Sequence, residues 1–106
     1  MSDKHFAAPL DLVPDAGSLA VTVDGHEIVL VRDGDEVFAL RDECSHAAIP
    51  LSEGDVEGRT IECWLHGSRF DVTTGEPLNF PATEPVPTYP TTIEDDRVYV
   101  ALAKEN

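Results

Sequence analysis

Five of the eight prolines fall between residues 76 and 90, and they constrain the fold more than any other feature of the chain. Each proline lacks a backbone N–H and fixes φ, so this stretch can form neither a helix nor a central strand. We therefore expect a stiff surface loop in this region. The five prolines are Pro77, Pro81, Pro85, Pro87 and Pro90.

The rest of the chain consists of short runs of Val, Ile and Leu that are separated by Gly, Asp and Pro. Helix-period patterns are almost absent, so the pattern predicts an all-β domain. Residues 26–32 and 36–40 flank Asp33-Gly34-Asp35, which is a strong hairpin signal. Further strands are predicted at 19–23, 60–63, 69–71, 93–94 and 97–102, with turns at Asp24-Gly25 and Asp95-Asp96.

The 106 residues are the size of one ordinary domain, so we expect residues 1–106 to form a single unit. Its middle, about residues 42–80, is rich in turns and contains both cysteines, two of the four histidines and the only tryptophan. Function is expected on loops that a rigid scaffold carries. The middle of the chain is therefore the candidate functional region.

Two mixed pairs of cysteine and histidine stand out in this middle. Cys44 and His46 form a Cys-x-His pair, and Cys63 and His66 form a Cys-x-x-His pair. Thiolates and imidazoles suit zinc, copper or iron–sulfur centres. Structural zinc sites usually use one ligand type in each pair, whereas both pairs here mix the types. The mixture fits a dinuclear cluster in which one iron takes both cysteines and the other takes both histidines, while a structural Cys2His2 zinc module remains an alternative.

The charge of the chain limits its partners. Seven basic and twenty-one acidic side chains give a net charge of −14. Nucleic-acid binding needs clustered Lys and Arg, and an anionic membrane attracts the same residues, so both partners are excluded. The acidic surface suits docking on basic surfaces of proteins, or it serves solubility.

The N-terminal residues contain no apolar run of signal-peptide length, and the longest apolar runs of four or five residues are far too short to span a bilayer. Two cysteines that lie nineteen positions apart are few for a disulfide-stabilised secreted domain. We therefore expect a cytoplasmic protein.

The residues around the two pairs resemble the Rieske motif, and the chain is most similar to the stand-alone Rieske ferredoxins that supply electrons to non-haem iron oxygenases. The resemblance extends over nearly the whole chain. It implies a Rieske-like antiparallel β-sandwich with a loop-rich, cluster-binding subdomain at about residues 42–80, covered by the loop around Pro81. The matching residues are Cys44-Ser45-His46, Leu51-Ser52-Glu53-Gly54, Cys63-Trp64-Leu65-His66-Gly67-Ser68-Arg69-Phe70-Asp71, Gly75 and Pro81.

The resemblance also implies a cofactor and partners. One Rieske [2Fe–2S] cluster would be held by Cys44, His46, Cys63 and His66. The protein would be a monomeric electron carrier rather than an enzyme. It would receive electrons from a flavin-dependent ferredoxin reductase and pass them to a terminal oxygenase, as a component of a dioxygenase system.

The chain departs from the high-potential Rieske proteins of respiratory complexes. Those proteins tie their two cluster loops by a disulfide, and the matching positions here are Ile49 and Leu65, so we expect apolar packing in its place. They also place a serine and a tyrosine hydroxyl near the cluster. Ser68 retains the first of these, but Phe70 replaces the tyrosine. Hydrogen bonds to cluster sulfur stabilise the reduced state, so we expect a potential in the lower part of the Rieske range.

An oxygenase would need a second iron, held by two histidines and a carboxylate. Only His5 and His26 remain for such a site; we expect His5 to lie in a frayed N-terminus and His26 at the start of a strand. The chain has no glycine fingerprint for binding NADH either. The remaining alternatives for a carrier are a Rieske ferredoxin of iron–sulfur cluster assembly or a nitrite-reductase small subunit.

Overall fold

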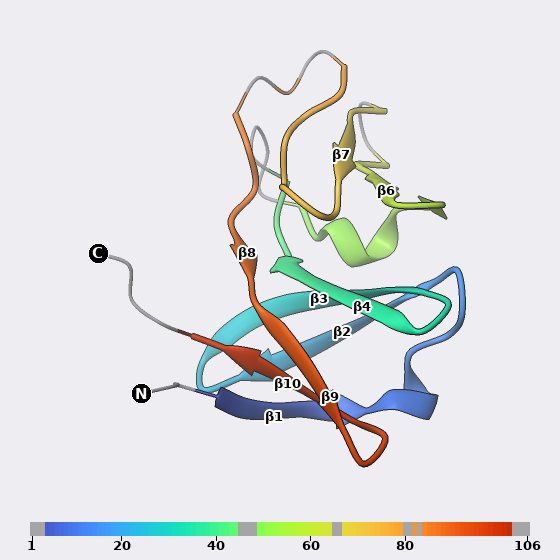
Figure 1. Ribbon diagram of the computed structural model, residues 1–106. Helices are drawn as coiled ribbons and strands as arrows, with labels where there is room; N and C mark the ends of the chain where they lie inside the picture. Colours follow the sequence, from blue (N-terminus) through green and yellow to red (C-terminus); the bar gives the residue numbers. More distant parts are fainter. Residues whose placement is uncertain (1–3, 45–48, 65–66, 80–81, 83, 103–106) are drawn as a thin grey trace.

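The computed structural model describes residues 4–44, 49–64, 67–79, 82 and 84–102, and within these residues the chain forms ten strands in three antiparallel sheets (Figure 1). Two single-turn 3-10 helices, η1 (Leu10–Leu12) and η2 (Leu51–Glu53), are the only helical elements of this part of the chain. Neither has the length or apolar character needed to cross a membrane. The predicted all-β class is confirmed.

The central sheet has the strand order β2-β3-β4-β8, and both hairpins predicted for it are present. β2 (Ser18–Val23) turns into β3 (His26–Asp33) at Asp24-Gly25, two residues with positive φ of 49° and 81°. Two positive φ angles are typical of the tight hairpin turns that match the twist of a sheet. β3 pairs with β4 (Glu36–Arg41), and the short β8 (Thr88–Tyr89) adds at the edge.

The second sheet has the order β1-β10-β9 and joins the two ends of the chain. β9 (Thr91–Glu94) and β10 (Arg97–Ala101) form the hairpin predicted at Asp95-Asp96. The prediction of a frayed N-terminus around His5 is wrong, because β1 (Lys4–Pro9) pairs with β10 and places His5 opposite Val100. The partner of β1 lies about ninety residues away in the sequence, so no local pattern could indicate this pairing.

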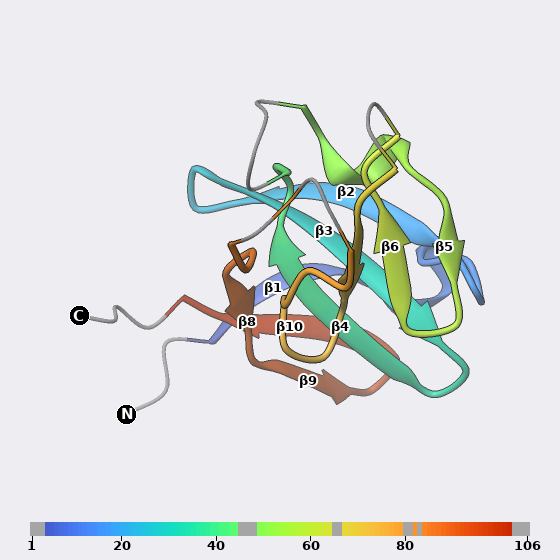
Figure 2. The ribbon, with the colours of Figure 1, turned by 90° about the horizontal axis from the view of Figure 1, so that it is seen from above.

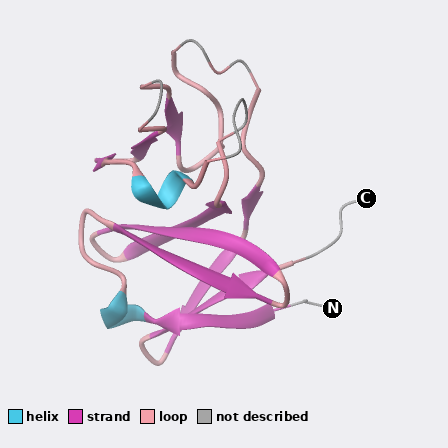
Figure 3. Cartoon of the chain, turned by 180° about the vertical axis from the view of Figure 1, so that it is seen from behind, coloured by secondary structure: helices cyan, strands magenta, loops and turns pink. Residues whose placement is uncertain are grey.

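The third sheet, of order β5-β6-β7, is small and lies among loops at the opposite end from β1. Its strands are β5 (Val56–Glu57), β6 (Thr60–Glu62) and β7 (Arg69–Asp71). We call this sheet with its flanking segments, residues 42–87, the loop-rich unit. It lies above the other two sheets when the molecule is viewed from behind (Figure 3), and seen from above it covers part of the central sheet (Figure 2).

The proline-rich stretch differs partly from its prediction. Its described residues contain no helix and no central strand, as expected, but they include the edge strand β8, which was not predicted. However, Ala82 and Val86 are 3% and 1% exposed and belong to the core, so the prediction of a surface loop is wrong at these positions. The prolines exclude regular structure, but they do not prevent the small apolar residues between them from packing inward.

β3 separates two apolar clusters and packs into both. Ile28 and Leu30 belong to the cluster between the central sheet and the β1-β10-β9 sheet, whereas Val29 and Val31 belong to the cluster beneath the loop-rich unit. All four side chains are fully buried. Successive side chains of a strand point to opposite faces, so a continuous apolar run is required where both faces are covered.

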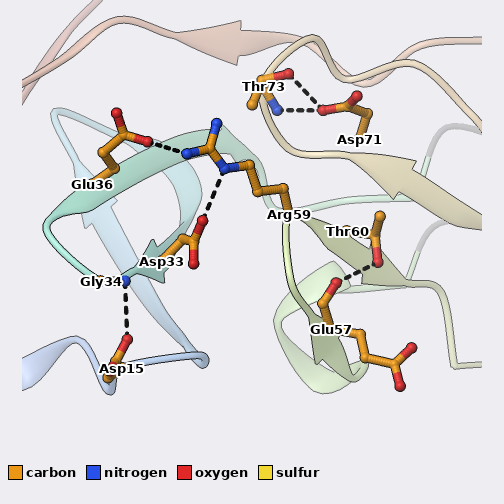
Figure 4. A network of polar contacts seen from close by, with 9 residues as sticks. All are labelled: Asp15, Asp33, Gly34, Glu36, Glu57, Arg59, Thr60, Asp71 and Thr73. Carbon is orange, nitrogen blue, oxygen red and sulfur yellow. Dashed lines mark hydrogen bonds and ion pairs between the residues drawn. The ribbon is translucent and has the colours of Figure 1, made fainter.

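Arg59, in the turn between β5 and β6, links the loop-rich unit to the β3–β4 hairpin (Figure 4). Its Nε donates to Asp33 at 2.8 Å, its Nη2 donates to Glu36 at 2.5 Å, and its guanidinium lies 5.3 Å from the ring centre of Phe38. The hydrogen bond to Asp33 and the charge of Glu36 raise the pKa of Arg59. The hairpin tip is held from its other side by Asp15, which accepts from the N–H of Gly34.

Candidate metal centre

Each cysteine opens a short loop that is closed by the same kind of backbone hydrogen bond. The N–H of Cys44 donates to the carbonyl of Ile49 at 2.9 Å, and the N–H of Cys63 donates to the carbonyl of Ser68 at 2.7 Å. In both cases the acceptor lies five positions after the cysteine. We call residues 44–49 loop 1 and residues 63–68 loop 2. The two halves of the sequence motif therefore share the same closing hydrogen bond.

Both cysteines are buried in one apolar cluster beneath the loop-rich unit. Cys44 is 3% exposed and Cys63 is 1% exposed, and no disulfide joins them. Leu51, Phe70 and Ala82 belong to the same cluster. Two thiols that emerge from two loops into a shared apolar environment are the donors that a soft metal or an iron–sulfur centre requires. The burial of both thiols in one cluster therefore fits a soft metal or an iron–sulfur centre.

The two histidines of the motif, His46 and His66, lie outside the described residues. His46 belongs to loop 1 and His66 to loop 2 by sequence, so each loop contains one cysteine and one histidine. Within the residues that are described, no three side chains of His, Cys, Asp or Glu converge as a metal site. The predicted four-residue ligand set therefore stays a prediction.

The segment that precedes and follows Pro81 is tied to loop 2 by side-chain hydrogen bonds. Asn79 accepts from the N–H of Arg69 at 2.8 Å through Oδ1 and donates to the carbonyl of Gly67 at 3.2 Å through Nδ2. The N–H of Ala82 donates to Oγ of the fully buried Ser68 at 3.0 Å. Pro81 itself lies outside the described residues. Its described neighbours hold this segment against loop 2.

Two glycines of the motif stand where backbones approach too closely for a side chain. A Cβ on Gly54 would lie 1.6 Å from the carbonyl oxygen of Glu62, and a Cβ on Gly75 would lie 2.0 Å from that of Val86. Gly54 thus allows the end of η2 to lie against β6. Gly75 allows the turn after β7 to lie against the proline-rich stretch.

Two aromatic residues of the motif have opposite environments. Phe70 is fully buried in the cluster that contains both cysteines, whereas Trp64 is 51% exposed at the start of loop 2. Trp64 is therefore a surface residue, while Phe70 packs in the interior. Leu78 is also largely exposed, so two large apolar side chains flank loop 2 on the surface.

Charged side chains surround loop 2 at the strands that lead into and out of it. Arg69 Nη2 lies 3.3 Å from carboxylate oxygens of both Glu57 and Glu62, so Arg69 pairs with two neighbouring acids. At the other end of β7, the Thr73 hydroxyl donates to Asp71 at 2.6 Å and the Thr73 N–H donates at 2.8 Å (Figure 4). These hydrogen bonds, the hydroxyl first, lower the pKa of Asp71.

Sequence reasoning missed two groups of supporting residues. Asn79 gave no signal, because a lone asparagine among prolines is an ordinary loop residue. Asp42 was also missed, and so was its hydrogen bonding across loop 1 to Ser52, a residue of the motif. Their only sequence signal is that they bracket the first cysteine pair and its closing residue.

The chain matches known proteins over nearly its whole length. A family model described as the Rieske [2Fe-2S] domain matches residues 4–90. The chain is 43% identical over 104 residues to the ferredoxin component of the naphthalene 1,2-dioxygenase system of Pseudomonas aeruginosa, and the match covers 97% of this chain and 100% of the relative.

Two solved structures have the same fold. The ferredoxin of carbazole 1,9a-dioxygenase from Nocardioides aromaticivorans IC177 matches with a TM-score of 0.90 at 39% identity, covering 94% of this chain and 98% of that one. A ferredoxin-sized chain from a complex of reduced oxygenase and oxidized ferredoxin in carbazole 1,9a-dioxygenase matches with a TM-score of 0.90 at 30% identity, covering 100% and 99% of the two chains.

Proposed function

Since this chain belongs to the Rieske [2Fe–2S] family, we propose that Cys44, His46, Cys63 and His66 hold one [2Fe–2S] cluster through which the protein carries single electrons. The main support is the position of Cys44 and Cys63, whose thiols are buried in one apolar cluster. Each cysteine also begins a loop that is closed by the same kind of backbone hydrogen bond. Each loop contains one histidine of the set. We assign the cluster-binding subdomain to about residues 42–80 because both loops fall there.

The expected resemblance to Rieske ferredoxins is confirmed, and so is the expected cofactor, one Rieske cluster. The protein is an electron-carrier component and not an oxygenase, since it matches a dioxygenase ferredoxin over the full length of that relative. The zinc-module alternative is wrong for a member of this family. The cluster-assembly and nitrite-reductase alternatives find no support among these relatives.

When bound, such a cluster takes up and releases one electron, and two thiolates with two neutral imidazoles give it a higher potential than four thiolates would. The chain's own residues hold and shield it. Apolar residues such as Leu51 and Phe70 keep water from the thiols. The hydroxyl of Ser68 is fully buried in the same environment, where a hydrogen bond that it donates is stronger than in water.

We propose two protein partners for the chain, a flavin-dependent ferredoxin reductase as donor and a terminal oxygenase for an aromatic substrate as acceptor. The related ferredoxins belong to naphthalene and carbazole dioxygenases, and one was solved in complex with its oxygenase. The net charge of −14 supports docking on basic partner surfaces. We also propose that the protein is a monomer and works in the cytoplasm, where cysteines stay reduced.

The test is iron and acid-labile sulfide analysis of freshly purified, anaerobically handled protein, followed by EPR of the dithionite-reduced form. We expect two irons and two sulfides per chain and an average g below that of an all-thiolate centre. His66→Ala should abolish this signal, whereas the matched variant His26→Ala should retain it. Absence of iron and sulfide from the wild-type protein, or retention of the same signal in His66→Ala, would refute the proposal.

A further inference from the structure

Loop 1 is closed a second time, at its neck, by two side chains. Asp42 directly follows β4, and its N–H donates to the carbonyl of Glu27 in β3 at 3.0 Å. Ser52, in η2, follows the loop. The Ser52 N–H donates to Oδ1 of Asp42 and the Ser52 hydroxyl donates to Oδ2, both at 2.7 Å. Two short bonds to two different oxygens fix the orientation of the carboxylate as well as its position.

The Asp42 carboxylate is buried, and none of the described basic side chains forms an ion pair with it. Asp42 is 9% exposed. The nearest basic residue in sequence, Arg41, pairs with Glu43 at 3.1 Å. Within the described part of the chain, no Lys or Arg nitrogen lies within ion-pair distance of Asp42. Among the described residues, the side-chain carboxylate accepts hydrogen bonds from the Ser52 N–H and hydroxyl, and at this buried position charges interact more strongly than in water.

The neck of loop 2 is built differently. Glu62 and Arg69 face each other across β6 and β7, and Arg69 Nη2 lies 3.3 Å from Glu62. A carboxylate thus stands at the neck of each loop, and among the described side chains a guanidinium pairs with the one at loop 2 but not with the one at loop 1. The Asp42 carboxylate lies two residues before Cys44.

We propose that Asp42 is a positioning residue: its bonds to Ser52 hold loop 1 closed, and its fixed negative charge lowers the reduction potential of the cluster. The inference rests on the proposed ligand set. Reduction adds one negative charge to the loops, so a fixed negative charge nearby disfavours the reduced form. The same two bonds keep Cys44 and Ile49 in register at the neck of the loop.

The decisive variant is Asp42→Asn, which keeps the shape and an oxygen that can accept from the Ser52 N–H but removes the charge. We expect the ratio of reduced to oxidised protein at a fixed ambient potential to rise about tenfold, which is about 59 mV for one electron. The matched control is Asp95→Asn, which removes one charge from the exposed turn between β9 and β10, at the far end of the molecule. We expect the potential of this control to equal that of the wild type.

Ser52→Ala separates geometry from charge, because it removes one bond and keeps the carboxylate. We expect it to release iron to a chelator several-fold faster while its potential stays at the wild-type value. Asp42→Ser, a second neutral variant, should show the same rise as Asp42→Asn and serves if that variant loads poorly. Equal potentials in a loaded neutral variant and in Asp95→Asn would overturn the inference, as would an equal rise in Ser52→Ala. A wild-type protein without iron and sulfide would instead refute the proposed function.

Discussion

Replacing Gly75 by alanine should weaken the attachment of the proline-rich stretch to the rest of the loop-rich unit. Gly75 follows β7 with a positive φ of 81°, and its carbonyl accepts the N–H of Val86 at 2.8 Å. This bond closes the stretch that passes over loop 2. The added Cβ would lie 2.0 Å from the carbonyl oxygen of Val86, a backbone atom that no side-chain rotation can move.

The expected loss of stability in Gly75→Ala is the sum of three contributions. Alanine in the left-handed region costs about 1 kcal/mol. Relieving the clash requires a backbone shift of about 1 Å, which breaks the bond between Gly75 and Val86 at a cost of about 1 kcal/mol. Val86 is 1% exposed, and partial exposure of a buried valine costs about 1–2 kcal/mol more. The sum is about 3–4 kcal/mol.

Gly25→Ala is the matched control, because Gly25 has the same φ of 81° but a Cβ added there would have no other atom within 4 Å. Only the conformational cost of about 1 kcal/mol applies there. We expect Gly75→Ala to lower the apparent midpoint of thermal cluster loss by about 10 °C more than Gly25→Ala does, followed by visible absorbance. Since cluster loss is irreversible, both variants are heated at one scan rate. Equal shifts of the midpoint in the two variants would refute the close approach of Gly75 to the Val86 carbonyl.

Three further predictions concern the loops and the turn after β7. Ser68→Ala removes a fully buried hydroxyl whose oxygen accepts from the Ala82 N–H. If the hydroxyl proton donates a bond worth about 1 kcal/mol to the reduced state, its loss should lower the reduction potential by about 40 mV in a redox titration. An unchanged potential would exclude this role. His46→Cys should lower the potential by more than about 100 mV, towards that of all-thiolate clusters, and an unchanged potential in a loaded variant would contradict the ligand assignment. Thr73→Val removes the hydroxyl that holds the pKa of Asp71 down, so about 0.5 kcal/mol of stability is lost at neutral pH. A lowered pKa stabilises the fold only at pH values above that pKa, so the difference in apparent melting temperature between Thr73→Val and the wild type should vanish as the pH falls through it. A difference that stays constant with pH would contradict this role of Thr73.

The strands that the sequence predicted are those whose partner lies next in the chain. The hairpins at Asp24-Gly25, Gly34-Asp35 and Asp95-Asp96 each join two neighbouring runs, and turn residues with positive φ mark them directly. β1, β5 and β8 were missed for different reasons. β1 depends on a partner at the other end of the chain. β5 and β8 have only two residues each and no periodicity to detect, and β8 also lies among prolines.

The ligand set could be predicted because metal chemistry demands particular residue types, and these types are rare in this chain. The supporting residues could not be predicted in the same way. An aspartate two positions before a cysteine, such as Asp42, is indistinguishable in sequence from the many other acids of this chain. Only the register of the central sheet and the position of η2 bring it against Ser52.

The loop-rich unit is attached to the central sheet by both ion pairs and apolar contacts, and the apolar contacts dominate. The side chains of Arg59, Asp33 and Glu36 are each 40% exposed or more, so water and salt screen their attraction. Val29 and Val31 are fully buried against the unit, and each contributes about 1.5–3 kcal/mol. The packed face of β3 therefore sets the position of the two cysteine loops, and the Arg59 ion pairs add a weaker and salt-dependent restraint on the hairpin tip.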